Sequence, residues 1–375
     1  MTGLYLHLPF CPDKCLYCSF NSRPAAGQDL HRYLDALESE LARMADHPWS
    51  RSQTFTSLYL GGGTPTIFPV ERLAALLGAC LDKLPFTTRP EISIEANPDT
   101  VSVDTLATLR QAGVNRLSIG VQSFSDPLLC AIGRTHSAAA AGHAFHAARR
   151  AGFTNINLDL IYGLPGQTGA DWHASLAAAV ALAPEHLCIY QLMVEPGSLL
   201  HRRIDETPLP DEDELVEMDR LTGLLLRGTD YRHYEISNFC RPGRQCRHNL
   251  NYWQNGSYLG LGAGAVSCFD GLRLKAVDDA SEYVRRMEGG IPVYEEGEAL
   301  SALAAYRETV VMGLRMTDGI DLVRLRRRFA LTPDEVYGDT LARLAGEGWL
   351  ERDGDTVRLS AAALPIANGV LCRLV

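Results

Sequence analysis

Three of the chain's ten cysteines lie close together in the sequence Cys11-Pro-Asp-Lys-Cys15-Leu-Tyr-Cys18. Thiolates at such short spacing can hold one metal centre, and they suit zinc or an iron–sulfur cluster. A structural zinc ion normally takes four protein ligands, whereas three thiolates leave one iron of a [4Fe–4S] cluster open. Phe20, two residues after the last cysteine, cannot be a fourth ligand. The spacing favours the cluster, with zinc completed from elsewhere as the alternative.

An iron with an open position can bind a ligand through an amine and a carboxylate. S-adenosylmethionine (SAM) presents both groups, and the radical chemistry then belongs to the cofactor while the protein orients it and excludes water. Such a site needs glycines for close backbone approach and an arginine for the carboxylate. It also needs a carboxylate for the ribose and an aromatic ring for the adenine. The candidates are residues 61–63, Arg134, Glu95 or Asp159, and Tyr17.

Six short β-rich runs alternate with amphipathic helical patterns in the first 235 residues. We expect strands at residues 3–9, 56–60, 91–96, 116–121, 155–162 and 186–194. We expect helices at residues 30–44, 70–84, 103–112, 137–151 and 172–182. This order predicts a parallel α/β sheet with right-handed crossovers, either an open or incomplete barrel or a doubly wound sheet.

The candidate polar residues follow the expected strands, and both architectures gather active-site groups at the C-terminal ends of strands. The glycines at 61–63 have a simpler interpretation, because they could merely end a strand. They lack the Lys-Ser/Thr ending of a P-loop, which excludes a phosphate loop of that kind. In chain order, the residues at or after the strand ends are Cys11, Gly61 to Thr64, Glu95, Gln122, Asp159 and Gln191.

Residues 236–300 are rich in glycine and aromatic residues and show no clear alternation of helix and strand. We interpret them as a connector. It carries Cys246-Arg-His248-Asn-Leu-Asn-Tyr252-Trp253. A histidine among aromatic residues could be an axial iron ligand of a flat macrocycle. The alternative is a loop whose His and Trp hydrogen-bond locally.

Residues 301–375 read as a helix-rich tail. Thr332 and Pro333 are typical of a helix start, with the helix running to residue 345. Residues 349–359 read as a hairpin turning at Asp353-Gly354, so the tail resembles a winged-helix module. Its arginines at 324 and 326–328 are either a nucleic-acid patch or a solvated helix face, and the acidic surroundings favour the latter.

The chain of 375 residues has 35 Lys and Arg, 45 Asp and Glu, and a formal net charge of −10. This charge argues against broad nucleic-acid binding. No apolar run approaches the ~20 residues of a membrane span, and the N-terminus lacks signal-peptide features. We therefore expect a cytoplasmic protein, with transient membrane association left open. Disulfides are rare there, so Cys80, Cys130 and Cys188 are expected as small buried hydrophobes, with Cys240, Cys246 and Cys268 left open.

Several motifs in order carry a family resemblance across essentially the whole chain. With them, the chain resembles the HemW-type radical SAM heme chaperones, which are relatives of the oxygen-independent coproporphyrinogen III oxidases. The motifs are Cys11-x3-Cys15-x2-Cys18, Tyr5-Leu-His-Leu-Pro-Phe-Cys11, Gly61-Gly-Gly-Thr-Pro-Thr66, Ile94-Glu95-Ala-Asn-Pro98, Gly120-Val-Gln122-Ser-Phe124, Asn157-Leu-Asp159-Leu-Ile-Tyr-Gly-Leu-Pro-Gly-Gln-Thr168, Tyr234-Glu-Ile-Ser-Asn238 and His248-Asn-x2-Tyr-Trp253.

The resemblance implies an incomplete parallel (β/α)6 barrel, similar to a TIM barrel, with a [4Fe–4S] cluster and SAM. It divides the chain into a barrel at 1–235, a connector at 236–300 and a winged-helix-like domain at 301–375. It implies Cys11, Cys15 and Cys18 as cluster ligands and His248 as a heme contact. For SAM it implies Tyr5, Tyr17, Gly62, Gly63, Thr64, Glu95, Gln122, Arg134 and Asp159.

Two branches of this family must be separated. The oxidases carry a further cysteine at the position of Phe20 and a long extension before the first cluster cysteine, where this chain has ten residues. Both departures favour a chaperone that binds heme and delivers it to acceptor hemoproteins, among them membrane-bound respiratory enzymes. The enzyme alternative is SAM-dependent oxidative decarboxylation of coproporphyrinogen III. A third possibility is a zinc-stabilised binding protein without radical chemistry.

Overall fold

The computed structural model describes residues 1–269 and 271–375. Within them, one curved sheet of 12 strands dominates, in the order β14-β13-β12-β11-β1-β4-β5-β6-β7-β8-β10-β9. Neighbouring strands from β11 to β8 run parallel. This confirms the expected incomplete parallel barrel. The six predicted strands are β1 (Thr2–Leu8), β4 (Phe55–Gly62), β5 (Phe86–Ala96), β6 (Arg116–Gln122), β7 (Ile156–Tyr162) and β8 (His186–Gln191).

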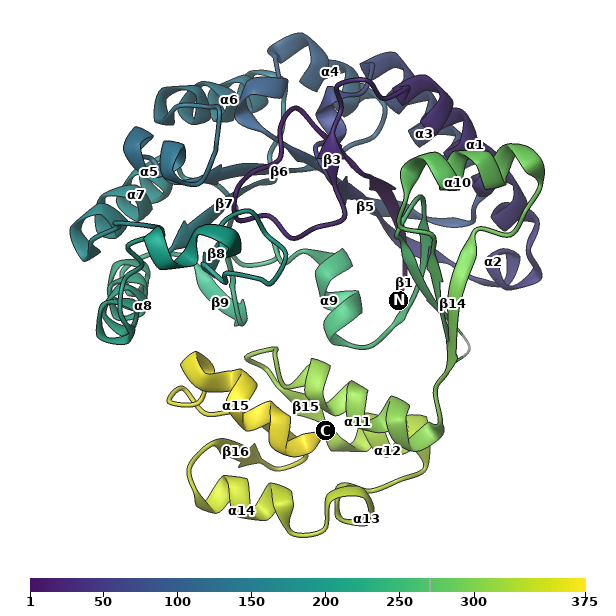
Figure 1. The fold of residues 1–375 in the computed structure, drawn as a ribbon. Coiled ribbons are helices and arrows are strands. Elements are labelled where there is room, and N and C mark those ends of the chain that lie inside the picture. The colour runs from purple at the N-terminus through teal and green to yellow at the C-terminus, as the bar shows by residue number, and fades with distance from the viewer. Residues whose placement is uncertain (270) are drawn as a thin grey trace.

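Helices cover the outer, convex side of the sheet (Figure 1). Their apolar stripes pack on the strands, and several begin with capping boxes, as at Thr168 with Asp171. No helix in the described ranges is both long and apolar enough to cross a membrane. The helices of this part are α1 (Leu30–Asp46), α2 (Pro48–Ser52), α3 (Val70–Lys83), α4 (Val103–Gln111), α5 (Asp126–Ala131), α6 (Ala138–Arg150), α7 (Gly169–Ala181) and α8 (Glu212–Arg227).

Residues from 232 onward add strands to both edges of this sheet, which the sequence pattern did not indicate. β14 shows why: five of its six residues are exposed, so it carries no apolar repeat. The three-part division of the chain into domains stays a prediction. The elements are β9 (Arg232–Glu235), β10 (Asn238–Cys240), α9 (Arg247–Trp253), β11 (Ser257–Leu261), β12 (Val266–Phe269), β13 (Leu272–Ala276), α10 (Ala280–Gly289) and β14 (Tyr294–Ala299).

The C-terminal part is a small helical unit with a three-stranded sheet, as a winged-helix-like module requires. The capping box of Thr332 confirms the predicted helix start. The single helix to residue 345 was wrong, because Gly338 breaks it with φ 52° and ψ −128°. The elements are α11 (Ala302–Gly313), β15 (Ile320–Asp321), α12 (Leu322–Phe329), α13 (Pro333–Tyr337), α14 (Thr340–Gly346), β16 (Leu350–Asp353), β17 (Thr356–Leu359) and α15 (Ala367–Leu371).

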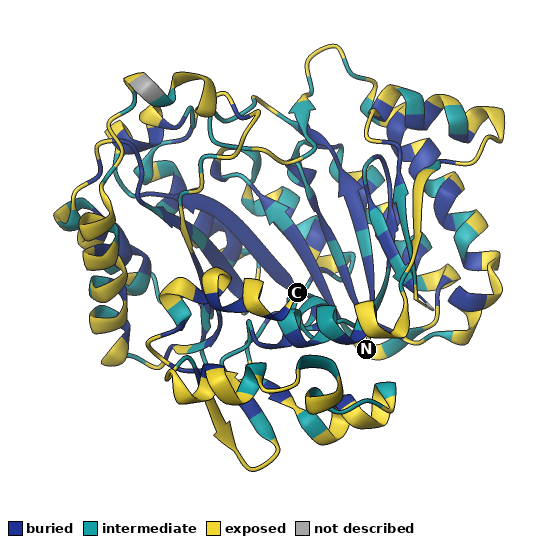
Figure 2. Cartoon of the chain, turned by 60° about the horizontal axis from the view of Figure 1, so that its bottom comes forward, coloured by how far each residue is buried: buried dark blue, intermediate teal, exposed yellow. Residues whose placement is uncertain are grey.

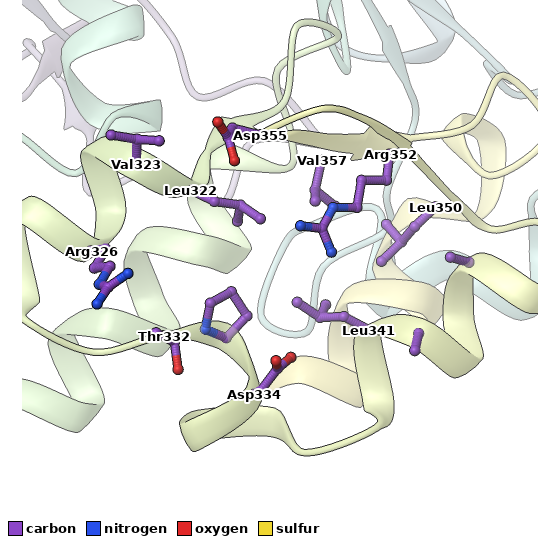
Figure 3. A pocket seen from close by; sticks show the side chains of 13 residues that line it. Leu322, Val323, Arg326, Thr332, Asp334, Leu341, Leu350, Arg352, Asp355 and Val357 are labelled. Atoms are coloured by element: carbon purple, nitrogen blue, oxygen red, sulfur yellow. The ribbon is translucent and has the colours of Figure 1, made fainter.

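Short 3-10 turns join several of these elements. They are η1 (Pro65–Ile67), η2 (Pro98–Thr100), η3 (His201–Glu206), η4 (Leu364–Ile366) and η5 (Cys372–Leu374). A cavity of about 310 Å³ lies in the C-terminal unit between α12, α14 and the β16–β17 hairpin. Figure 3 shows its mixed lining, with Leu322, Leu341 and Val357 beside Arg326 and Asp334.

The buried residues concentrate in the sheet, whose central strands are dark blue in Figure 2. Cys80 and Cys188 are buried, which confirms the expectation for them. The expectation for Cys130 was wrong, because this residue is exposed. In the short helix α5, Leu128 and Leu129 occupy the buried face and direct the next residue outward.

Candidate cofactor site

The three clustered cysteines lie on a loop that follows β1 and is held at several points. Its ends pair as the short strands β2 (Phe10–Cys11) and β3 (Arg23–Pro24). Leu16 N donates to Ile132 O at 3.0 Å, and Lys14 Nζ donates to Phe20 O at 2.6 Å. Figure 1 shows this purple loop across the inside of the curved sheet. All three cysteines line one cavity of about 430 Å³.

The glycines after β4 pack against the backbone that leads into Cys11. Gly63 N donates to Leu8 O at 2.9 Å, and Thr64 N donates to Phe10 O at 2.8 Å. A Cβ on Gly63 would lie 2.5 Å from Phe10 O, too close for any side chain. Gly62 has φ +103°, which favours glycine. These glycines therefore let two backbone segments meet below the cysteine loop.

Glu95, near the end of β5, lies half-buried beside the glycine segment. Its Oε1 accepts from Tyr59 Oη at 2.8 Å, and its Oε2 accepts from Gly62 N at 3.2 Å. Burial raises the pKa of Glu95 to about 7, and nearby Asp159 adds to the rise. A carboxyl with this pKa can accept from a ribose hydroxyl when ionised, or donate to a ligand when protonated.

Asp159 lies on β7, two strands along the sheet from β5, and faces the same cavity. Its Oδ1 accepts from Asn157 Nδ2 at 2.7 Å, and its Oδ2 accepts from Ser118 Oγ at 3.3 Å. Burial raises its pKa above the usual range despite these bonds. The Asn157 side chain also bonds to His186 Nδ1 at 2.6 Å. Asp159 is thus partnered, as an acid in an apolar strand must be.

Arg134 connects the strand ends to the cysteine loop. Its Nη2 donates to Gly120 O at 2.5 Å and to Asn97 Oδ1 at 3.0 Å. Its Nη1 lies 3.5 Å from Cys15 Sγ. Gln122, at the end of β6, has a positive φ of 66°, a sparsely populated conformation that accompanies a register shift against β7.

Most of the predicted residues therefore surround one cavity. Tyr5 is an exception: its hydroxyl hydrogen-bonds to His7 Nδ1 at 3.0 Å, outside the lining. Gln191, at the end of β8, joins the lining as expected from its position. The predicted residues that line the cavity are Cys11, Cys15, Cys18, Tyr17, Gly62, Gly63, Thr64, Glu95, Gln122, Arg134 and Asp159.

His248 lies outside this lining, at the start of α9. Its Nδ1 hydrogen-bonds to Ser57 Oγ at 2.9 Å, and its Nε2 hydrogen-bonds to Tyr252 Oη at 3.1 Å. Its ring stacks on Tyr59 at a centroid distance of 5.1 Å. Burial lowers its pKa to about 3, so the imidazole is neutral. Both ring nitrogens are used by the protein, and the heme contact stays a prediction.

Several polar residues of the cavity wall were not predicted from the sequence. A signal was present, because β6 reads Arg116-Leu-Ser118-Ile-Gly120, alternating polar or small residues with apolar ones. Alternate residues of a strand point to the same face. The apolar set faces the helices, so the alternate set faces the cavity. The missed lining residues include Tyr59, Asn97, Arg116, Ser118, Asn157, Cys188 and Asn238.

These residues fit the expected cofactors. Among residues 1–269 and 271–375, no three His, Cys, Asp or Glu side chains are arranged to hold a metal ion. An iron–sulfur cluster spreads its thiolate ligands over different irons, which suits three cysteines around a cavity mouth. The buried polar groups beside that mouth suit a polar ligand such as SAM.

Comparisons with known proteins agree with this geometry. The Radical SAM superfamily model matches residues 5–179, and the HemN C-terminal domain model matches residues 300–366. The heme chaperone HemW of Bacillus subtilis is 34% identical over 99% of this chain and 98% of its own. That of Mycobacterium tuberculosis is 36% identical over 98% of this chain and 93% of its own. The chain belongs to the HemW family.

The HemW family lies within the radical SAM superfamily, whose members use a [4Fe–4S] cluster and SAM. A solved relative, the coproporphyrinogen III oxidase HemN of Escherichia coli, is 25% identical. The structural match covers 100% of this chain and 89% of the HemN chain, with a TM-score of 0.88. This chain and HemN thus share both the barrel and the C-terminal unit. The overall fold therefore does not separate the two branches.

Proposed function

We propose that this protein binds heme and delivers it to acceptor hemoproteins. Cys11, Cys15 and Cys18 would hold a [4Fe–4S] cluster with SAM beside it, and together these groups supply radical chemistry when it is needed. The observation that carries the proposal is the position and exposure of Phe20. This side chain is 70% exposed and lines the cavity, at the position where the oxidases have a further cysteine.

The mouth of the cavity supports a flat apolar cargo. Tyr190 and Met193 are 44% and 63% exposed and also line it. Exposed apolar side chains that gather at one opening are typical of binding surfaces. Aromatic rings and a thioether can pack on a porphyrin face, and a thioether can also ligate heme iron. An exposed heme suits transfer better than a sealed reaction does.

The predicted role of His248 can be reconciled with its burial. Neutral imidazole is the form that ligates metals. Breaking its bond to Tyr252 would free Nε2, so a movement of α9 would present a ready ligand. Under this proposal, His248→Ala removes the histidine signature from the absorption spectrum of bound heme. Tyr252→Phe, the matched control, keeps the imidazole and leaves that signature. An unchanged spectrum in His248→Ala would remove His248 as a ligand.

The function itself is tested with anaerobically reconstituted protein. We expect tight binding of hemin and transfer of the bound heme to an apo-hemoprotein, followed by absorbance. Phe20→Ser should weaken hemin binding, whereas Leu303→Ser, an exposed apolar residue of α11, should not. A protein that binds no hemin, or never releases it to an acceptor, would contradict the proposal.

The likeness to HemN keeps one alternative function in view. If this chain is an oxidase, the same preparation converts coproporphyrinogen III to protoporphyrinogen with SAM and a reductant. We expect no such product. Product formation at a rate that depends on Cys11, Cys15 and Cys18 would establish the oxidase function instead.

A further inference from the structure

The barrel cavity contains a buried cation without a partner. Arg116, the first residue of β6, is only 2% exposed, and its side chain lines the cavity. Its Nε is buried without a hydrogen-bond acceptor. Within residues 1–269 and 271–375, its guanidinium makes no hydrogen bond or ion pair. A buried charge is costly unless it is paired and hydrogen-bonded, so this arrangement needs an explanation.

None of the carboxylates around Arg116 bonds to it directly, although the charge of nearby groups, Glu91 among them, outweighs burial and raises the pKa of Arg116. Each carboxylate takes its bonds from other donors. Glu91 accepts from Arg247 N and His248 N, both at 3.0 Å, at the start of α9. Asp159 accepts from an amide and a hydroxyl, and Glu95 accepts from a hydroxyl and a backbone N–H. Burial raises the pKa of both Glu95 and Asp159, and the positive charge of Arg116 acts against that rise.

Arg134, the other arginine of the cavity, differs in this respect. Its terminal nitrogens are already bonded to Gly120 O, Asn97 Oδ1 and Cys15 Sγ. Arg116 therefore has the uncommitted guanidinium. A planar guanidinium binds a carboxylate through two parallel N–H bonds, which are stronger than neutral hydrogen bonds.

We propose that Arg116 is the anion-binding residue of the barrel cavity and receives a carboxylate of the bound ligand. This inference deepens the proposed function and rests on it for one of two ligand sources. The carboxylate belongs either to the methionyl part of SAM, which the sequence alone assigned to Arg134, or to a propionate of the heme. Both have the same chemistry at Arg116, so the experiment must separate them.

The test compares each acid with its uncharged counterpart in the same protein. Hemin is paired with hemin dimethyl ester, and SAM with decarboxylated SAM. In the wild-type protein, the acid of one of the two pairs should bind roughly 10- to 100-fold more tightly than its uncharged counterpart. Arg116→Gln should bring that ratio close to one, and Arg116→Lys should leave it intermediate. Arg220→Gln, an exposed arginine of α8, is the control and keeps the wild-type ratio.

The ratio separates binding from folding, because a general defect weakens both members of a pair equally. If Arg116 only balances buried charge, Arg116→Gln lowers the unfolding midpoint and leaves both ratios unchanged. That outcome, or a wild-type ratio near one in both pairs, overturns the inference. A protein that binds neither hemin nor its ester contradicts the proposed function instead. In that case, the SAM pair alone decides the role of Arg116.

Discussion

At the scale of single residues, Glu40 is a buried acid whose ionised form is costly. Glu40 of α1 accepts from Tyr283 Oη at 2.6 Å and from Gly262 N at 2.9 Å, while its Oε1 has no partner. Burial raises its pKa to about 7. Such a carboxyl stabilises the fold when it is protonated, because the unfolded chain gives up its proton at lower pH.

The stability contribution of Glu40 should therefore depend on pH. It is fully present below about pH 4.5 and is lost as the pH rises through about 7, in total about 3 kcal/mol. Glu40→Gln keeps the shape without the titration. Relative to wild type, the variant should gain about that amount between pH 4.5 and pH 8. Urea denaturation at several pH values measures the difference. A difference that does not change with pH would contradict the assignment.

Gly63 and Gly78 provide a second comparison of single residues. A Cβ at Gly63 would meet two backbone carbonyl oxygens, whereas at Gly78, inside α3, nothing lies within 4 Å. Gly63→Ala should lower the free energy of unfolding by at least about 1–3 kcal/mol and weaken SAM binding. Gly78→Ala should raise the free energy of unfolding by about 0.5–1 kcal/mol, because alanine favours a helix. Thermal denaturation and calorimetry with SAM test both. A silent Gly63→Ala would mean that this segment can move.

Among the elements, α9 depends on an acid from a distant strand. Glu91, in β5, accepts from the backbone N–H groups of Arg247 and His248 at the start of the helix. Cys246 Sγ lies 3.5 Å from the same carboxylate. A negative charge at a helix N-terminus is favourable, and buried N–H groups are costly when unpaired. The Glu91 side chain thus attaches α9, the helix that carries the His248 motif, to the sheet.

Removing this acid should loosen α9 before the barrel unfolds. We expect Glu91→Gln to cost about 1–2 kcal/mol and Glu91→Ala about 3 kcal/mol, because alanine leaves both N–H groups without acceptors. Hydrogen exchange should accelerate at the amides of residues 247–253. Exchange in β6 should stay slow in both variants. Equal acceleration across the sheet would show that α9 does not open separately.

Among residues 1–269 and 271–375, two of the three clusters of buried apolar residues are large. The larger lies between the sheet and its helices, and the smaller lies in the C-terminal unit around Tyr306, Leu344 and Val370. Most of the contacts that join the two parts are polar: Thr317 N donates to Tyr234 O at 3.1 Å, Arg328 bonds to backbone oxygens after α9, and Asn255 and Arg273 bond to Glu308. Parts with their own cores can unfold at different temperatures.

Calorimetry should accordingly resolve two unfolding transitions. Leu344→Ala, in the smaller core, should lower the free energy of unfolding of the C-terminal unit by about 2–5 kcal/mol, so that one transition moves to lower temperature. SAM binding to the barrel should be unchanged. Leu158→Ala, fully buried in β7, should lower the other transition and weaken SAM binding. A single transition that shifts equally in both variants would show that the two parts unfold together.

Local sequence patterns determined the β/α order, the helix starts and the cavity-facing strand ends, because these depend on spacing along the chain. The cysteine spacing likewise indicated a cluster, because its three thiolates come from one short loop. The weakly patterned edge strands were missed: β14 is nearly all exposed, so no apolar repeat marked it. Cys130 was misplaced because a six-residue helix is too short for its buried face to show in sequence.

Tertiary structure alone decided which polar groups meet and which lack partners. No spacing along the chain places Glu91 at the start of α9, more than 150 residues later, or seats His248 between Ser57 and Tyr252. Nor does it distinguish Arg134, which is bonded on several sides, from Arg116, which is not. Such differences arise because folding brings separate strands and helices around one cavity. The chemistry of a buried charge depends on those neighbours.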